Sequence, residues 1–134
     1  MSEDELVHAW RELLQRYHTT SCALDRTLRE RHDLGLSEFE VLEQLVETPA
    51  TCQSPARRMQ ELGERVQLSQ SALSRVVARL ERDGLVERTM CADDRRGIYV
   101  MLTDAGRIRH ADAVATHREV LADHLDVPTP LITA

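Results

Sequence analysis

The fold class follows from residues 69–84, whose sequence is Ser-Gln-Ser-Ala-Leu-Ser-Arg-Val-Val-Ala-Arg-Leu-Glu-Arg-Asp-Gly. This stretch predicts one amphipathic helix, with Ser69 as its N-terminal cap and Gly84 as the glycine that follows its C-terminus. Its apolar residues recur at helical spacing and form one stripe, made of Leu73, Val76, Val77 and Leu80. The opposite face is polar and carries three arginines. Such a helix packs on a core through one face and presents the other face to a partner.

A second short helix and a hairpin flank this helix in the sequence. The preceding helix is predicted over about 56–66 and is joined to it by the short link 66–68. After the glycine the pattern changes to two strand-like runs, 85–90 and 97–102, with the polar loop 91–96 between them. Two helices joined by a tight turn and followed by a β-hairpin make a winged helix-turn-helix.

Long helices are predicted before this unit. Apolar residues at steps of three, four and seven predict a helix from Glu3 to about Arg31. That helix is longer than a small domain needs to cover its own core, so we expect part of it to pack on another subunit. Another helix is predicted from Ser37, with Glu40 completing a capping box.

The sequence also predicts a last helix and a division of the chain into regions. Thr103 caps a helix from 104 to about 125, and two prolines then end regular structure. We expect one mainly α domain with a small β-hairpin wing. In this division, 3–48 and 104–125 form a helical dimerisation region, 56–103 form a winged helix-turn-helix lobe, and 126–134 form a C-terminal tail.

The composition excludes several classes of protein. The chain has 134 residues and is 42% hydrophobic, so it is too apolar to be disordered and long enough to bury its own core. Its longest apolar run, Ile98 to Leu102, is far too short to cross a bilayer. Three cysteines without paired spacing fit neither a disulfide scaffold nor a zinc site, and we predict no metal and no cofactor. The acidic start lacks the pattern of a secretion signal, so we expect a cytoplasmic protein without membrane contact.

The charges are distributed unevenly along the chain. All 17 basic residues are arginine, and 23 acidic residues bring the net charge to −6, which by itself argues against a nucleic-acid binder. Residues 1–56 hold 5 Arg against 11 acids, residues 57–109 hold 11 against 8, and residues 110–134 hold 1 against 4. A cationic centre between anionic ends indicates that the middle of the chain meets a polyanion.

The polar face of the helix at 69–84 carries side chains that suit the major groove of DNA. Gln bonds adenine edges, Arg bonds guanine in a bidentate fashion, and Ser reaches phosphate or base. An ordinary exposed helix with solvated arginines is the alternative, which the confinement of Glu81 and Asp83 to the last turn disfavours. The DNA-contacting residues predicted here are Ser69, Gln70, Ser71, Ser74, Arg75 and Arg79.

Further DNA contacts are predicted at the hairpin tip and at the start of the helix expected over about 56–66. Arg95 and Arg96 stand at the end of a two-stranded ribbon, where a guanidinium can enter the narrow minor groove. Asp94 is predicted to brace one of these arginines. Arg57 and Arg58 are candidates for flanking phosphate contacts, with solvated surface as the alternative.

Three motifs have the order and spacing of one known family. They are Leu68-Ser69-x-Ser71-x-Leu73-Ser74-Arg75, Leu80-x-x-x-Gly84-Leu85-Val86, and Asp94-Arg95-Arg96 followed by Leu102-Thr103-x-x-Gly106. Together they resemble the MarR family of winged-helix transcriptional regulators, and the resemblance covers residues 3 to about 125. It implies a homodimer in which the terminal helices form the dimerisation region and two winged lobes bind a pseudo-palindromic operator in double-stranded DNA. It also implies that a ligand or oxidant acts in the cleft between these regions and changes the lobe spacing.

The predicted function is sequence-specific transcriptional regulation by a homodimeric repressor that a small aromatic or anionic ligand relieves. An enzyme is not expected, because the sequence has no glycine-rich phosphate loop and no GxSxG or HExxH motif. A winged-helix module for protein interaction without DNA binding is an alternative. Its recognition face would lack charge, and the arginines described above argue against it.

Three kinds of trigger are compatible with the sequence. Trp10, Tyr17 and His18 are candidates for a ligand pocket, and core packing is the alternative for each. Cys22 and Cys91 are candidates for redox sensing in a regulator of the same fold.

The third candidate trigger is a metal ion bound by a stripe of histidines. His110, His117 and His124 are spaced seven apart along one helix, with about 10 Å between neighbours, which is too far for one metal site. A solvated or interface stripe that confers pH dependence is the favoured interpretation.

Overall fold

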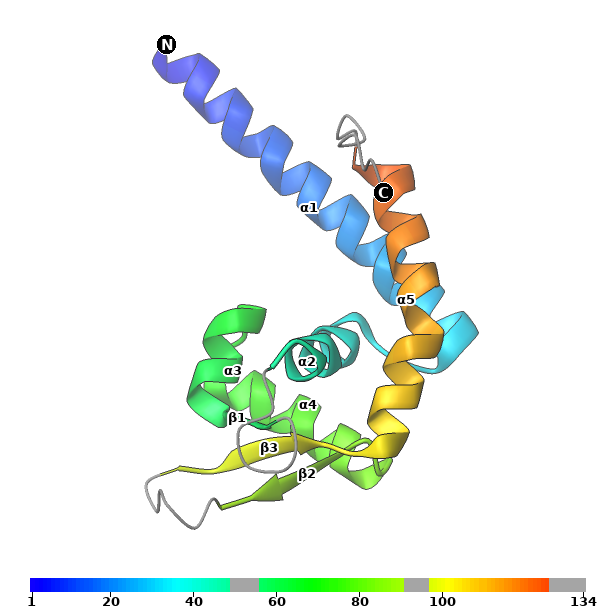
Figure 1. Ribbon diagram of the computed structural model, residues 1–134. Helices are drawn as coiled ribbons and strands as arrows, with labels where there is room; N and C mark the ends of the chain where they lie inside the picture. The colour runs from blue at the N-terminus through cyan, green and yellow to red at the C-terminus, as the bar shows by residue number, and fades with distance from the viewer. Residues whose placement is uncertain (49–55, 91–96, 126–134) are drawn as a thin grey trace.

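The computed structural model describes residues 1–48, 56–90 and 97–125, and these ranges form five helices and three strands (Figure 1). The helices are α1 (Glu3–His32), α2 (Leu36–Val46), α3 (Met59–Val66), α4 (Gln70–Arg82) and α5 (Asp104–His124). The strands are β1 (Ala56–Arg58), β2 (Val86–Thr89) and β3 (Tyr99–Leu102). The predicted mainly helical fold with a hairpin wing is confirmed. None of the described helices is both long and apolar enough to cross a membrane.

The sheet contains one strand that the sequence pattern did not predict. Its order is β1-β3-β2, all antiparallel, with Val86 opposite Leu102 and Ala56 opposite Met101. The helix predicted from residue 56 therefore starts later, at Met59, and the prediction was wrong for the first three residues. Three residues are too few to show a strand period, and the pairing partner of β1 lies about 40 residues further along the chain.

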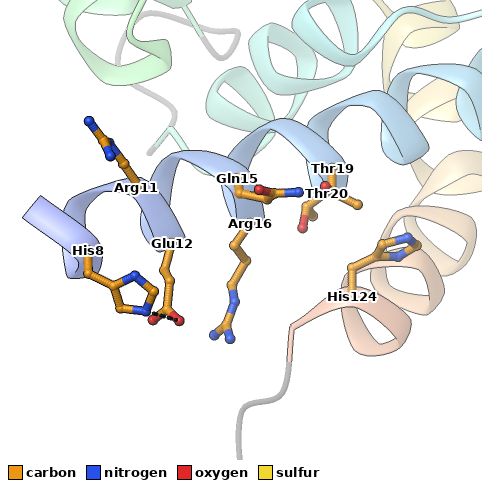
Figure 2. A pocket seen from close by; sticks show the side chains of 8 residues that line it. All are labelled: His8, Arg11, Glu12, Gln15, Arg16, Thr19, Thr20 and His124. Carbon is orange, nitrogen blue, oxygen red and sulfur yellow. Dashed lines mark ion pairs between the residues drawn. The ribbon is translucent and has the colours of Figure 1, made fainter.

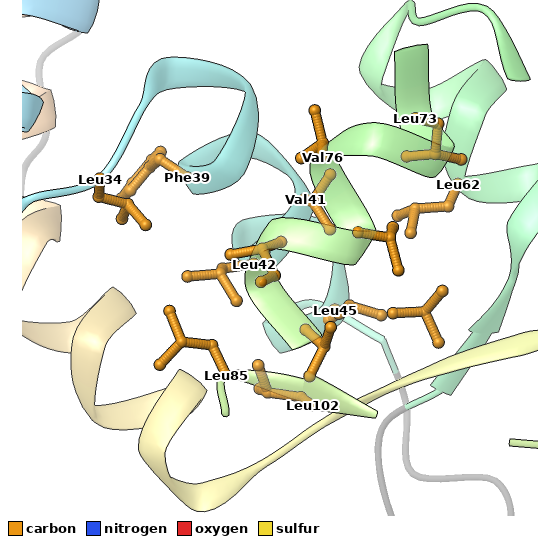
Figure 3. Packing of buried hydrophobic residues seen from close by; sticks show 14 of the residues in the cluster. Leu34, Phe39, Val41, Leu42, Leu45, Leu62, Leu73, Val76, Leu85 and Leu102 are labelled. Carbon is orange, nitrogen blue, oxygen red and sulfur yellow. The ribbon is translucent and has the colours of Figure 1, made fainter. Parts of the chain in front are cut away.

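The core lies between α2, α3, α4 and the sheet (Figure 3). The predicted stripe of α4 is buried as expected, with Leu73, Val77 and Leu80 completely inaccessible to solvent. Phe39 and Leu42 of α2 belong to the same cluster and are also inaccessible. Helix α2 therefore shares its core with the winged lobe, although the predicted division, which stays a prediction, places residues 3–48 in the dimerisation region.

The start of α2 differs from the prediction. The helix begins at Leu36 rather than Ser37, its N-cap is Gly35, and no side chain caps it locally, so the predicted capping box with Glu40 is wrong. Asp25 of α1 takes over part of this role, because its Oδ1 accepts a hydrogen bond of 3.0 Å from the Leu36 backbone N–H. A carboxylate from another helix thus satisfies one of the free donors at this terminus.

Helix α1 has two dissimilar halves. Its C-terminal half packs on α5 through a small cluster of Ala23, Leu24 and Val120. Every residue from 3 to 19 is exposed, and Figure 1 shows this half extending away from the rest of the molecule. Large apolar side chains lie on that exposed half, namely Leu6, Val7, Trp10, Leu13, Leu14 and Tyr17.

Two histidines of the predicted stripe lie in the junction between α2 and α5. His110 and His117 are buried, and their rings stack on Phe39 with centroid distances of 5.1 and 4.4 Å. The expectation of a solvated or interface stripe is therefore wrong for these two residues. No group of metal ligands forms among the described residues.

Hydrogen bonds and charges link the same junction. Glu43 of α2 accepts hydrogen bonds from His110 at 3.2 Å and from Arg118 at 2.6 Å, both on α5. Arg118 also donates to His117 Nδ1 at 2.7 Å, so this nitrogen must be unprotonated. Burial lowers the pKa of His117, and the neighbouring positive charge of Arg118 lowers it further. Burial alone would raise the pKa of Glu43, but the hydrogen bonds from Arg118 and His110 outweigh that effect and lower it.

We expect the free energy of unfolding to fall as the pH drops below about 6.5, the unfolded pKa of histidine. Below that value the unfolded chain binds a proton that folded His117 does not bind, so the stabilisation is present above the unfolded pKa and is lost toward the lowered folded pKa. Urea unfolding between about pH 7.5 and 5 measures this loss. His117→Gln should reduce it, whereas His8→Gln, on the exposed half of α1, should leave it unchanged. An equal pH dependence in both variants would contradict the assignment.

Candidate nucleic-acid interface

Helices α3 and α4 form the helix-turn-helix. Gln67 ends α3 in the left-handed conformation (φ 59°), and the N–H of Leu68 donates to the Gly63 carbonyl at 3.0 Å, which keeps the link short. Ser69 then caps α4, since its Oγ accepts a hydrogen bond of 3.2 Å from the Ala72 N–H. The turn and the cap fix where the recognition face of α4 begins.

The exposed face of α4 carries two arginines, Arg75 near the middle of the helix and Arg82 at its last residue. Ser71, Arg75, Ala78 and Arg82 lie opposite the buried stripe, and all four are exposed. Neither Arg75 nor Arg82 makes an ion pair with any residue of the described ranges. Two exposed cations that flank a small alanine form a surface suited to close approach by a polyanion.

Other predicted residues lie at the edges of this face. The Arg79 Nε is 3.6 Å from Glu38 Oε1 of α2, so its guanidinium is held beside the core. The Gln70 side chain lies against α3, where its Nε2 is 2.5 Å from the position that a Cβ on Gly63 would occupy. Ser74 is partly buried. The structure therefore places Ser71 and Arg75 centrally and Gln70, Ser74 and Arg79 at the periphery.

Arg88 of β2 joins the wing to α4, and the sequence analysis missed it. Its Nη2 donates to the Ser74 carbonyl at 3.3 Å, and its Nε lies 3.6 Å from Glu81 Oε1. The Arg88 backbone N–H also donates to the Glu81 carboxylate at 3.3 Å. The sequence signal for this contact is a glutamate in the last turn of α4 followed seven residues later by an arginine. This spacing brings the two side chains together only because β2 folds back on α4.

The two arginines before α3 have different environments. Arg57 is buried in β1, donates to the Gln44 carbonyl at 3.0 Å and pairs with Glu61 at 2.7 Å. This corrects the expectation of a phosphate contact for Arg57, because strand alternation turns its side chain inward. Arg58 is exposed, and its Nε donates to the Tyr99 hydroxyl of β3 at 3.1 Å.

The predicted wing tip lies outside the described residues. This applies to Arg95 and Arg96, to the bracing Asp94 and to Cys91. Strand β2, which precedes this loop in the chain, packs against α4 (Figure 1).

The model of the MarR family matches residues 32–97, a range that holds α2, the helix-turn-helix and part of the wing. The chain belongs to the MarR family.

The chain is similar to individual proteins both in sequence and in fold. The chain is 33% identical over 72 residues to the HTH-type transcriptional repressor MdtR of Bacillus subtilis (strain 168), a match that covers 54% of this chain and 46% of MdtR. The chain thus spans about half the length of this curated relative. Its fold is similar to BldR of Sulfolobus solfataricus, with a TM-score of 0.83 and 26% identity over 97% of this chain and 90% of BldR. It is also similar to Sco3205 of Streptomyces coelicolor, a MarR-family regulator solved in complex with DNA, with a TM-score of 0.80 and 28% identity over 93% and 78% of the two chains.

A groove of about 490 Å³ lies where α1 approaches the winged lobe of this MarR-family chain. Tyr17 lines it as predicted, whereas Trp10 and His18 do not, which corrects the predicted pocket. Trp10 lies further out on the exposed half of α1, and His18 contacts the exposed Cys22, with 3.7 Å between Nε2 and Sγ. The apolar lining consists mainly of Leu13, Leu24, Leu36, Val66 and Leu121.

Thr20 lies between this groove and a second hollow. The second hollow, of about 540 Å³, is polar and lies between α1 and the end of α5, where Arg16 and His124 line it (Figure 2). Thr20 lines both spaces, yet its Oγ1 is buried and has no hydrogen-bond partner among the described residues.

Glu40 lines the groove from α2, and burial raises its pKa, with the negative charge of Glu43 adding to the effect.

We expect Thr20→Val to raise the free energy of unfolding by about 1–3 kcal/mol, because it replaces an unsatisfied buried hydroxyl with a methyl group of similar shape. Urea unfolding measures the change. Thr19→Val is the matched control, since its hydroxyl is exposed, and should change stability by less than about 0.5 kcal/mol. A destabilised Thr20→Val variant would show that the hydroxyl has a partner.

Proposed function

We propose that this chain is a sequence-specific transcriptional regulator that binds double-stranded DNA, represses transcription as a homodimer and has no enzymatic activity. The observation that carries this proposal is the pair of exposed arginines on the outer face of α4, Arg75 near its middle and Arg82 at its last residue, which have no ion-pair partner in the described part of the chain. Two relatives support it: Sco3205 was solved with DNA, and MdtR is a repressor.

In the proposed complex α4 lies in the major groove. Arg75 projects from the first half of the helix and suits a bidentate contact with guanine, and Ser71 lies one turn before it on the same face. The N-terminus of α4 offers free backbone donors to a phosphate. Arg58, exposed on the sheet, and Arg95 and Arg96, at the predicted wing tip, supply phosphate and minor-groove contacts.

The proposed dimer uses the exposed half of α1 together with α5. Six large apolar side chains between residues 6 and 17 are 39–72% exposed, and a second copy would remove them from water. A two-fold dimer places two copies of α4 about 34 Å apart along one face of DNA, which requires a pseudo-palindromic operator. We accordingly assign α1 and α5 to the dimerisation region and residues 34–103 to the DNA-binding lobe.

The groove between α1 and the lobe is the proposed effector site. Its volume of about 490 Å³ falls within the range of about 300–1,000 Å³ that is typical of small-molecule pockets. Apolar walls suit an aromatic ring, and Arg16 and Arg65 at its border suit an anionic group. An occupant would touch both α1 and the α3–α4 link, so it can change the lobe spacing.

The test begins with selection of duplexes from a random library by the purified protein. For the best selected duplex, Arg75→Ala should weaken binding by about 10- to 100-fold, since a bidentate base contact contributes about 1–3 kcal/mol. Binding to a scrambled duplex should change much less. Arg26→Ala removes an exposed arginine of α1 and should leave both affinities unchanged. If the wild-type protein selects no sequence, the proposed function is wrong.

Wing variants should behave differently from Arg75→Ala. Arg95→Ala and Arg96→Ala should weaken binding to selected and scrambled duplexes alike. The slope of log affinity against log salt should also fall by about 0.9 for each phosphate that the variant no longer neutralises. Fluorescence anisotropy titrations at several salt concentrations measure both quantities. A loss of affinity confined to the selected duplex would assign the wing arginines to base recognition.

A further inference from the structure

Glu38 is a buried carboxylate that contacts the recognition helix. It lies in the first turn of α2 and is only 6% exposed. Its Oε1 is 3.6 Å from the Nε of Arg79, which projects from the edge of α4 and is about half exposed. Burial of a carboxylate is costly unless a charge or a hydrogen bond compensates for it. The pair with Arg79 therefore fixes both side chains at the junction of α2 and α4.

The same carboxylate faces α1 on its other side. A Cβ added to Gly35 would lie 3.0 Å from Glu38 Oε1 and 2.7 Å from Arg29 Nη2, so both charged groups border this glycine and attract each other without a direct ion pair. Arg29 is itself held by Asp25, one turn earlier on α1, through a hydrogen bond of 2.9 Å. Asp25 also accepts the hydrogen bond from the first residue of α2, Leu36. Charged groups of α1, α2 and α4 thus lie near one another, with Glu38 between Arg29 and Arg79.

We propose that Glu38 is a positioning residue for DNA recognition, which holds Arg79 at the edge of α4 and couples that arginine to α1. This inference rests on the proposed function and adds to it. Arg79 is then a braced side chain of the recognition helix and not a direct reader of base sequence.

The ion pair between Glu38 and Arg79, called the brace below, favours specific over non-specific DNA binding. An arginine released from Glu38 can swing toward the nearest phosphate, because its long side chain is flexible and its exposed end is already beside the DNA-facing surface. One added phosphate contact strengthens binding to every sequence and steepens the salt slope by about 0.9. Base contacts through Arg75 gain nothing from this movement. Discrimination between DNA sequences therefore falls when the brace is removed.

The principal test compares Glu38→Gln with the wild-type protein on the selected duplex and on a scrambled duplex. The variant should bind the scrambled duplex about threefold more tightly, with a salt slope steeper by about 0.9, and the ratio of the two affinities should fall. Glu38→Asp keeps the charge and should restore part of the ratio. Glu64→Gln, which removes an exposed charge from α3, is the charge-matched control and should leave the salt slope unchanged.

A double-mutant cycle with Arg79→Ala separates positioning from a general effect of charge or stability. In the Arg79→Ala background, Glu38→Gln should cause no further change in the salt slope or in the affinity ratio. The inference is overturned if the effect of Glu38→Gln persists without Arg79, or if Glu38→Gln alone leaves both quantities at their wild-type values. If the wild-type protein selects no sequence, the proposed function fails first and this inference fails with it.

Gly35→Ala provides a variant that retains every charge. The backbone of Gly35 (φ −71°, ψ 159°) is accessible to alanine, and the atoms that the new methyl group meets are the ends of two flexible side chains. The methyl should displace Glu38 and Arg29 and change the salt slope in the same direction as Glu38→Gln. Gly97→Ala, which adds a methyl group where no atom of the described residues lies within 4 Å, is the control. Equal behaviour of the two alanine variants would overturn the coupling to α1.

Discussion

The packing of α2 against every other helix is the constraint on which the structure depends. Its apolar side chains complete the core of the lobe, so its acidic side chains are forced into contact with neighbouring elements. Glu38 meets Arg79 of α4, and Glu43 meets Arg118 of α5. Because α1 caps α2 from a third side, one short helix sets the positions of the recognition helix and of both long helices.

Much of this arrangement could be predicted from local sequence, because the signals are local. The caps of α1, α4 and α5 each lie three residues before the backbone N–H that they accept from, and the stripe of α4 repeats within one helix. What the sequence did not show depends on distant partners. The cap of α2 comes from Asp25, the third strand requires β3, and Arg88 gains its role only when β2 folds back on α4. Arg57 is likewise buried because β1 pairs with the distant strand β3.

The distribution of charge also becomes clear from the tertiary contacts. A net charge of −6 argued against DNA binding when it was taken alone. In the structure, acidic side chains of α2 neutralise arginines that stand beside the core. Arg75 and Arg82, in contrast, pair with no carboxylate of the described ranges and lie on the outer face of α4. The electrostatic attraction to a polyanion is therefore concentrated on one surface.

The length of α1 has a geometric consequence. Thirty residues of uninterrupted helix extend about 45 Å, and a rigid rod of that length converts a small angular change into a large displacement. A tilt of about 5° at one end moves the other end by about 4 Å, which exceeds the spacing of about 3.4 Å between successive base pairs. If the outer end of α1 is anchored in a dimer, a tilt of about 5° at that end is enough to move the end next to the lobe by more than one base-pair step.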